Sequence, residues 1–209
     1  MKAEISGLYA VTPDLADTSA LLGMVEAAVA GGARLLQYRN KIADATLRLE
    51  QARALVALCR RHRVPLIIND HLELALSVDA EGLHLGSEDG SVADARNRLG
   101  PAKLLGVSCY RLVEKARDAA SLGADYVAFG GFFPSRVKPG AVRAPLSLLG
   151  EAKRVQPLPI VAIGGITVEN APELITAGAD SVAVISALFD GPDIKATAQR
   201  FNALFAKGR

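Results

Sequence analysis

The chain has 209 residues, of which 50% are hydrophobic and 5% aromatic, and its formal net charge is +2 at pH 7. No block of lysines and arginines stands out, so we expect neither a nucleic acid nor a membrane surface as a partner. No apolar run reaches the length that crosses a bilayer and the N-terminus carries no targeting signature, which predicts a cytoplasmic protein. The two cysteines, Cys59 and Cys109, lack metal-ligand spacing and are expected to be small buried residues.

Strand-like and helical patterns alternate along the whole chain. The expected strands cover residues 5–11, 35–38, 65–69, 82–85, 104–108, 126–129, 160–163 and 180–187. The expected helices cover residues 19–30, 44–62, 71–77, 92–99, 112–122, 146–154, 168–177 and 193–206. Similar triplets, Gly-Ala-Arg or Gly-Ala-Asp, stand between a helix and a strand at residues 32–34, 123–125 and 178–180.

Eight strand–helix units without a linker predict one domain over residues 1–209, an α/β fold of the (β/α)8 TIM-barrel class. A doubly wound open sheet is the alternative, but the number and shortness of the strands argue against it. In such a barrel the ligand site lies at the carboxyl ends of the strands. The residues that follow each strand are therefore the ones to examine.

The ends of the last two strands predict a phosphate site. Gly164 and Gly165 follow residues 160–163 and let the backbone N–H groups approach a ligand closely, and Thr167 is expected to cap the next helix. The eighth strand ends near Ser186, a small hydroxyl. Loops after strands seven and eight of TIM barrels often form a phosphate cup. The alternative is a tight strand-to-helix turn that binds nothing.

A cluster of polar side chains follows the second strand. Because alternate residues of an extended chain share a face, Gln37, Arg39 and Lys41 are expected to point the same way. A guanidinium can bind phosphate oxygens in bidentate fashion, and an ammonium adds a mobile point charge. The pattern predicts a polyanion site, with a solvated charged edge as the alternative.

Acidic residues follow the third and fourth strands. Asp70 comes directly after Asn69, and Asp89 ends the run Gly-Ser-Glu-Asp at residues 86–89. Mg²⁺ is usually bound by one or two carboxylates together with water and substrate phosphates, so we expect Asp70 and Asp89 to bind Mg²⁺. Glu88 is either a third acid or the start of a loop. The alternative for Asp89 is an acid favoured in the first turn of a helix.

The remaining candidates lie after the fifth and sixth strands. Ser108 ends the fifth, and the long loop at residues 130–145 offers Ser135, Arg136 and Lys138, which could close over a charged substrate. His84 alternates with leucines and is expected to pack inside the barrel rather than bind metal. No Ser/His/Asp or Cys/His arrangement is indicated, so a nucleophilic enzyme is not expected.

Six of these motifs together resemble the thiamine-phosphate synthase family. They are Gln-Tyr-Arg-Asn-Lys at 37–41, Ile-Ile-Asn-Asp at 67–70, Gly-Leu-His-Leu-Gly at 82–86, Gly-Val-Ser at 106–108, Val-Ala-Ile-Gly-Gly-Ile at 161–166 and Val-Ala-Val-Ile-Ser at 182–186. The resemblance runs from residue 8 to residue 186, in order and at the family's spacing. It implies a TIM barrel that joins an aminopyrimidine-methyl diphosphate to a thiazole phosphate with the help of Mg²⁺, releasing diphosphate. Both substrates are small molecules, and a homo-oligomer is compatible with the sequence.

The resemblance also implies roles for single residues. It assigns Gln37, Arg39, Lys41 and Asn69 to the pyrimidine diphosphate, and Asp70 and Asp89 to Mg²⁺. It assigns Ser108 and Lys138 to the pyrimidine substrate or its diphosphate. It assigns Gly165, Ile185 and Ser186 to the thiazole phosphate, with help from Ser135, Arg136 and Val137. Arg39, Lys41, Ser108 and Lys138 are the residues expected to act in catalysis.

The chain departs from the family pattern mainly in the sixth loop. The family commonly has Pro-Thr-x-Thr-Lys, whereas residues 134–138 are Pro-Ser-Arg-Val-Lys, so Val137 lacks a hydroxyl and Arg136 is expected to supply a new phosphate contact. Gly131 stands in place of a usual proline and Ser87 in place of a usual glutamine. Two alternatives remain open, a thiazole tautomerase of the same superfamily and a non-catalytic barrel that binds thiamine precursors. A sugar-phosphate epimerase would need an acid/base pair that the sequence does not offer.

Overall fold

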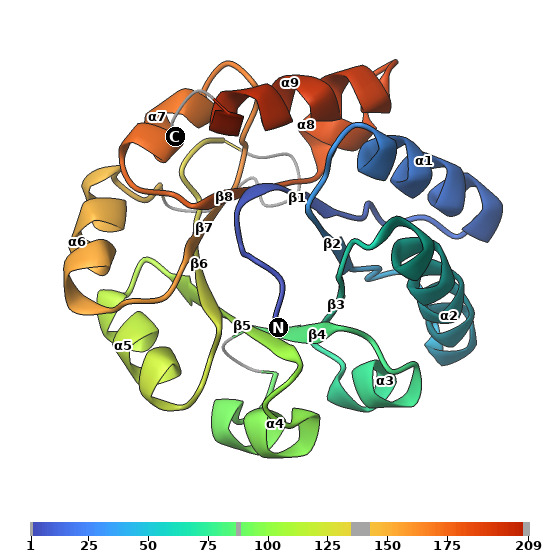
Figure 1. Ribbon diagram of the computed structural model, residues 1–209, viewed down its shortest axis with the longest axis horizontal. Helices are drawn as coiled ribbons and strands as arrows, with labels where there is room; N and C mark the ends of the chain where they lie inside the picture. Colours follow the sequence, from blue (N-terminus) through green and yellow to red (C-terminus); the bar gives the residue numbers. More distant parts are fainter. Residues whose placement is uncertain (1, 87–88, 135–142, 207–209) are drawn as a thin grey trace.

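The computed structural model describes residues 2–86, 89–134 and 143–206 of the chain. Within these residues eight parallel strands close into a barrel in sequence order, and β8 pairs with β1. Helices surround the barrel on its outside (Figure 1). The strands are β1 Gly7–Val11, β2 Leu35–Tyr38, β3 Leu66–Asn69, β4 Gly82–Leu85, β5 Leu104–Tyr110, β6 Tyr126–Gly130, β7 Ile160–Ile163 and β8 Ser181–Val184. The TIM-barrel class predicted from the sequence is confirmed.

Most helices also lie where the sequence predicts them. They are α1 Thr18–Ala30, α2 Ala45–His62, α3 Leu72–Ser77, α4 Val92–Leu99, α5 Val113–Ser121, α6 Ser147–Val155, α7 Ala171–Thr176, α8 Ser186–Phe189 and α9 Ile194–Ala206. None of the described helices combines the length and the apolar composition that a membrane crossing requires. Burial confirms the expectation for the two cysteines and raises the pKa of each thiol to about 12.

Two local predictions are wrong, both at the carboxyl ends of the last strands. The eighth strand ends at Val184, and Ser186 opens the short helix α8 instead of extending the strand. Helix α7 begins at Ala171 rather than at residue 168, and Thr167 is not its cap, because Asn170 holds the preceding turn. The Asn170 side chain accepts a hydrogen bond from the Thr167 N–H (2.9 Å) and donates one to the Gly165 carbonyl (3.1 Å).

Alternation along the strands divides the apolar residues into two layers. One face of each strand packs against the surrounding helices, and the other face fills the inside of the barrel. Tyr9, Leu35, Ile67, Tyr126 and Val161 belong to the inner layer. Because both faces are buried, the strands are almost continuously apolar, which is the pattern that predicted them.

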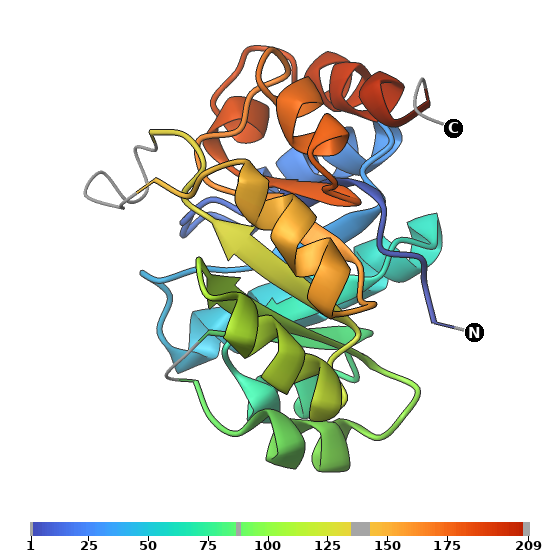
Figure 2. The same cartoon turned by 90° about the vertical axis from the view of Figure 1, so that its left-hand side faces the viewer.

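At the amino-terminal end of the barrel, a carboxylate that recurs before every second strand from β4 to β8 binds the backbone of the preceding strand. Glu81, Asp125 and Asp180, which precede β4, β6 and β8, accept backbone N–H bonds from Leu66 (3.2 Å), Leu105 (2.8 Å) and Ile160 (2.6 Å). Each carboxylate follows a buried alanine and a residue of positive φ. Two of the three triplets that recur in the sequence, at residues 123–125 and 178–180, therefore join adjacent strands at this end. Figure 2 shows the N-terminal segment on this side of the barrel, opposite the side toward which the arrow of β6 points.

Candidate active site

The described candidates all lie near or after the carboxyl ends of strands, and because the strands are parallel these ends share one side of the barrel. They are Gln37, Arg39, Lys41, Asn69, Asp70, Asp89, Ser108, Gly165, Ile185 and Ser186. The sixth-loop candidates Ser135, Arg136, Val137 and Lys138, as well as Glu88, lie outside the described residues. Some of the described candidates belong to two separate clusters of interacting side chains. One cluster is charged and centres on Asp70 and Asp89, and the other is neutral and includes Gln37 and Ser108.

The charged group centres on two carboxylates. The side chains of Asp70 and Asp89 lie next to each other, and the Lys41 ammonium lies 2.5 Å from Asp70. Burial and the neighbouring Asp70 carboxylate raise the pKa of Asp89. Burial would also raise the pKa of Asp70, but the bonds from Lys41 and Asp89 outweigh it and lower that pKa. As the pH falls, Asp89 therefore takes up a proton before Asp70 does.

The geometry of the pair suits a hard divalent cation. Asp70 has a φ of 64°, which turns its backbone sharply after β3, and its N–H donates to the His84 carbonyl (2.8 Å). The Asp89 carboxylate is oriented by the Gly86 N–H (2.8 Å). In the part of the chain that the structure describes, no three His, Cys, Asp or Glu side chains form a metal-holding group. Two carboxylates suffice for Mg²⁺ where substrate phosphates supply further oxygens, so these residues fit the expected ion.

Two residues of the β1–α1 loop hold the cations in place. The Asp14 carboxylate accepts a hydrogen bond from the Arg39 guanidinium (3.1 Å) and another from the Lys41 N–H (2.7 Å). The Thr12 hydroxyl donates to the Arg39 carbonyl (2.8 Å) and accepts from the Arg39 N–H (2.9 Å). The backbone that carries Arg39 and Lys41 is thus fixed to β1, and the two cations reach the site from a rigid support.

The neutral group lies inside the barrel. The Gln37 amide nitrogen donates to the Tyr9 hydroxyl (3.0 Å), and the Tyr9 and Tyr126 hydroxyls are 2.8 Å apart. His84 lies between Tyr126 and Ser108, with Nδ1 3.1 Å from the Tyr126 hydroxyl and Nε2 2.8 Å from the Ser108 hydroxyl. Burial lowers the pKa of His84 to about 4, so its ring is neutral near pH 7. The prediction that His84 packs inside the barrel is confirmed.

The two glycines of the predicted phosphate cup form the sharp turn that the sequence suggested. Gly164 and Gly165 have φ values of 108° and 64°, in the region that favours glycine. A Cβ on Gly165 would collide with the carbonyl oxygens of Pro134 and Phe133, so the glycine is also required where the β6 and β7 loops meet. Beside this turn, Ile185 and Ser186 form the start of α8. A short extra helix after β8 accompanies many phosphate sites of TIM barrels.

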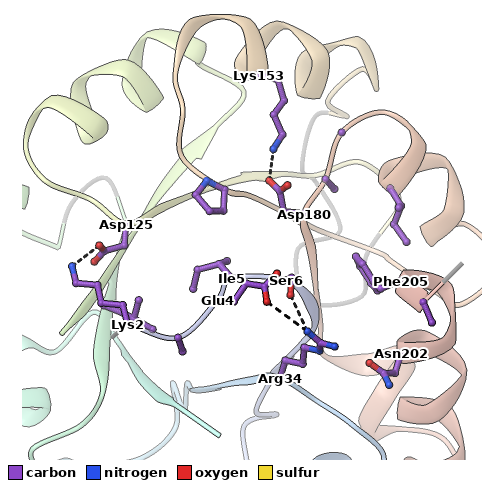
Figure 3. A pocket seen from close by; sticks show the side chains of 17 residues that line it. Lys2, Glu4, Ile5, Ser6, Arg34, Asp125, Lys153, Asp180, Asn202 and Phe205 are labelled. Atoms are coloured by element: carbon purple, nitrogen blue, oxygen red, sulfur yellow. Dashed lines mark hydrogen bonds and ion pairs between the residues drawn. The ribbon is translucent and has the colours of Figure 1, made fainter. Parts of the chain in front are cut away.

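A large cavity lies at the other end of the barrel. It has a volume of about 710 Å³ and lies between residues 2–6 and the amino-terminal ends of the strands. Its charged side chains bind one another, Lys2 with Asp125 and Lys153 with Asp180, each at 2.5 Å (Figure 3). Charges already neutralised at the structural end of the barrel do not make a site for a charged substrate.

Comparison with known proteins identifies the family. A sequence model of the family described as thiamine monophosphate synthase matches residues 8–188. The chain belongs to this family. The thiamine-phosphate synthase of Methylobacillus flagellatus is 57% identical over 201 residues, which cover 96% of this chain and 96% of that protein. The thiamine-phosphate synthase of Thiobacillus denitrificans is 54% identical over 206 residues, which cover 99% of this chain and 98% of that protein.

A solved structure agrees with this result. Thiamine phosphate pyrophosphorylase from Pyrococcus furiosus superimposes on the present structure with a TM-score of 0.85 and a sequence identity of 32%, covering 96% of each chain. The family that the six motifs resemble is thereby confirmed.

Several residues of the candidate site of this thiamine monophosphate synthase family member were missed by sequence reasoning. Thr12 and Asp14 follow the first strand, where the rule of examining every strand end could have found them. Tyr9 and Tyr126 lie within strands and gave no signal, because a single tyrosine in an apolar run is an ordinary core residue. Their contacts with Gln37 and His84 come only from the folded barrel.

Proposed function

We propose that the protein is an enzyme that catalyses the thiamine-phosphate synthase reaction at the carboxyl end of its barrel. It joins an aminopyrimidine-methyl diphosphate to a thiazole phosphate, two small molecules, in the cytoplasm. The bond between the pyrimidine methylene carbon and the diphosphate oxygen breaks first, and its electron pair leaves with the diphosphate. The thiazole nitrogen then forms the new bond to the methylene cation, which gives thiamine phosphate and free diphosphate.

The observation that carries this proposal is the charged group of the site. Lys41 stands beside the Asp70–Asp89 pair, and Asp14 binds both the Lys41 backbone and the Arg39 guanidinium. Two cations close to a metal-binding pair stabilise the negative charge that develops on a departing diphosphate, which is electrostatic catalysis. A reaction of this kind needs no protein nucleophile, in keeping with the neutral interior group.

Asp70 and Asp89 are the residues that would hold Mg²⁺. The ion, when bound, supplies positive charge to the diphosphate oxygens. Gln37 and Asn69 orient the pyrimidine diphosphate from the ends of β2 and β3, and Ser108 contacts the same substrate from β5. Lys138 of the sixth loop adds a further cation to the departing group.

The thiazole phosphate binds at the other side of the same barrel end. The turn at Gly165 and the start of α8, with Ile185 and Ser186, bind the phosphate through backbone N–H groups and the serine hydroxyl. Ser135, Arg136 and Val137 complete this half of the site. If Arg136 takes over the contact that Val137 cannot make, Arg136→Ala raises the KM for thiazole phosphate. An unchanged KM would remove Arg136 from the phosphate site.

A thiazole tautomerase would need the phosphate cup without the diphosphate cations, and a non-catalytic barrel would need neither the cations nor the acidic pair in this arrangement.

The decisive experiment is release of diphosphate on mixing the protein with both substrates and Mg²⁺. We expect release that requires both substrates, stops with EDTA and returns when excess Mg²⁺ is added. No release from folded protein that binds both substrates would favour the tautomerase or the binding barrel instead.

A further inference from the structure

A chain of five polar side chains crosses the inside of the barrel from β2 to β5. It runs from Gln37 to Tyr9, from Tyr9 to Tyr126, from Tyr126 to His84 and from His84 to Ser108, with donor–acceptor distances of 3.0, 2.8, 3.1 and 2.8 Å. Both ends, Gln37 and Ser108, are residues assigned to the pyrimidine substrate. The three central residues have no role in the proposed reaction, although each is at most 6% exposed.

The packing of the barrel fixes the three central rings. The Tyr9 and Tyr126 rings meet edge to face with centroids 6.0 Å apart, and His84 stacks on Tyr126 at 5.6 Å. On the neighbouring strand β5, a Cβ on Gly106 would collide with the Tyr126 ring and its hydroxyl. The glycine thus leaves the space in which the Tyr126 hydroxyl reaches both of its partners.

Counting protons shows that the two ends of the chain depend on each other. Each of the four hydrogen bonds contains one proton, and each tyrosine and the neutral imidazole can supply only one. Because a buried hydroxyl proton without an acceptor is costly, both tyrosines are expected to donate. If the Gln37 amide then donates to Tyr9, Tyr9 donates to Tyr126 and Tyr126 donates to Nδ1 of His84. The Nε2–H of His84 then donates to Ser108, whose own proton stays available. In the reverse order, Ser108 donates to His84, and Tyr9 donates to the Gln37 carbonyl.

The amide nitrogen of Gln37 faces Tyr9, which selects the first of these two orders. We propose that Tyr9, Tyr126 and His84 are positioning residues that make the Ser108 hydroxyl a donor toward the substrate and leave the Gln37 carbonyl oxygen as an acceptor. This inference rests on the proposed function, because it takes the bound ligand to be an aminopyrimidine. Such a ring offers ring nitrogens that accept and an amino group that donates, which is the complementary pattern.

The arrangement also limits what His84 itself does. Both ring nitrogens are engaged, one by Tyr126 and one by Ser108, so neither is left to take a proton from a substrate. His84 acts on the substrate only through Ser108. A hydrogen-bond pattern held on three interlocked rings needs no rearrangement when the substrate arrives, which favours binding.

The first test is the tautomer of His84 in the full-length wild-type protein, read from ¹⁵N NMR of the imidazole nitrogens. The signals are assigned by comparison with His84→Gln, since the chain has only 3 histidines. We expect the tautomer protonated at Nε2. A tautomer protonated at Nδ1 would overturn the proposal, whatever the protein catalyses.

The second test interrupts the series of hydrogen bonds at its middle residue and keeps the aromatic ring of that residue. Tyr126→Phe removes one hydroxyl, so we expect the Kd for the pyrimidine diphosphate to rise about ten-fold and the His84 signals to shift toward a mixture of tautomers. The Kd for thiazole phosphate should stay within about two-fold. Tyr9→Phe interrupts the same series of hydrogen bonds one residue earlier. If Tyr126→Phe fails to fold, Tyr9→Phe should show the same rise in the Kd for the pyrimidine diphosphate and the same unchanged Kd for thiazole phosphate.

Ser181→Ala is the matched control, because it also removes one buried hydroxyl, bonded to the Gly7 carbonyl at 2.9 Å, but at the amino-terminal end of the barrel. It should leave both Kd values and the His84 signals unchanged. An unchanged pyrimidine Kd in both tyrosine variants would overturn the proposal. Because the Kd is measured without turnover, failure of this inference is distinct from absence of diphosphate release, which would contradict the proposed function.

Discussion

The ammonium group of Lys41 lies 2.5 Å from the Oδ2 atom of Asp70, so a diphosphate-binding candidate and a metal-binding candidate are paired in the ligand-free protein. The Lys41 side chain is 54% exposed, whereas that of Asp70 is 12% exposed. The mobile partner is therefore the lysine. It can leave the carboxylate for a substrate phosphate once another cation neutralises Asp70, which couples metal binding to the binding of the diphosphate.

Lys41→Ala tests which substrate this lysine serves. We expect the KM for the pyrimidine diphosphate to rise by about ten- to a hundred-fold, since a charge-assisted contact is lost, and the KM for thiazole phosphate to stay within about two-fold. Lys103→Ala is the control, because Lys103 is also 2.5 Å from an aspartate, Asp79, near the opposite end of the barrel. Equal losses for both substrates in Lys41→Ala would mean that the two halves of the site are wrongly placed.

Asp70→Asn removes the charge of the proposed metal ligand and keeps its backbone. Asparagine tolerates a positive φ, here 64°, better than alanine does, so the free energy of unfolding should change by less than about 1 kcal/mol. Turnover in the presence of Mg²⁺ should fall at least about a hundred-fold. Asp70→Ala should lose the same activity and about 1 kcal/mol more stability, measured by urea unfolding. Full activity of either variant would remove Asp70 from the metal site.

Asp14 holds two cations in place and also adds a negative charge to the site. Its replacement shows which of these two effects on substrate binding is larger. Asp14→Ala loses the bonds to Arg39 and to the Lys41 N–H, so the KM for the pyrimidine diphosphate should rise about ten-fold. Removing a negative charge from a phosphate site acts in the opposite direction, but Asp14 is 34% exposed and solvent weakens that effect. Asp14→Asn keeps an acceptor for the Lys41 N–H and should lose less. A KM for the pyrimidine diphosphate that falls in Asp14→Ala would show that the negative charge of Asp14 matters more than its hydrogen bonds to Arg39 and Lys41.

The fold was predictable because nearly every boundary has a local cause. Residues 82–85, 92–99 and 160–163 match the observed elements at both ends, since glycine, proline or a capping residue limits each of them. The short helix α8 was missed because residues 180–187 form one apolar run, and a helix of one turn inside it leaves no periodic signal. The start of α7 was misplaced because Thr167 and Asn170 are both capping residues, and only the tertiary turn decides between them.

The charged half of the candidate site was predictable for a similar reason. Arg39, Lys41, Asp70 and Asp89 each follow a strand, and parallel strands bring their ends together whatever the details of the loops. The hydrogen bonds of the neutral half were not predictable, because the bond between Tyr9 and Tyr126 joins residues 117 positions apart in the sequence. Which buried hydroxyls meet inside a barrel depends on strand register, which a sequence pattern does not fix.

Asp180→Ala should destabilise the fold without changing the site. The carboxylate accepts from the Ile160 N–H at 2.6 Å, so its removal leaves a strand donor without this acceptor and should lower the free energy of unfolding by about 1–3 kcal/mol. Asp180→Asn keeps an acceptor and should lose less. Both variants should bind the two substrates like the wild type, because Asp180 lies at the amino-terminal end of the barrel. A raised KM for either substrate in Asp180→Ala would contradict the assignment of substrate binding to the carboxyl end of the barrel and of stability to the amino-terminal end.

His84 should make the stability of the protein fall in mild acid. Burial lowers its pKa to about 4 in the folded protein, whereas the ordinary value is 6.5. Between these values the unfolded chain binds more protons than the folded one, so the free energy of unfolding decreases as the pH falls from about 6.5 to about 4, by up to ~3 kcal/mol. Above about pH 7 the contribution should be constant, because the imidazole is then neutral in both states.

The measurement for His84 is urea unfolding between about pH 4 and pH 7, for the wild type and for His84→Gln, which cannot titrate. Acidic groups contribute to the same curve, so the informative quantity is the difference between the two slopes, which should be greatest between about pH 4.5 and pH 6. His62→Gln is the control for replacing a histidine as such, since His62 is 33% exposed and lies beside Glu26. Parallel curves for the wild type and His84→Gln would mean that His84 can be protonated inside the folded barrel, and the neutral hydrogen-bond chain from Gln37 to Ser108 would then not hold in acid.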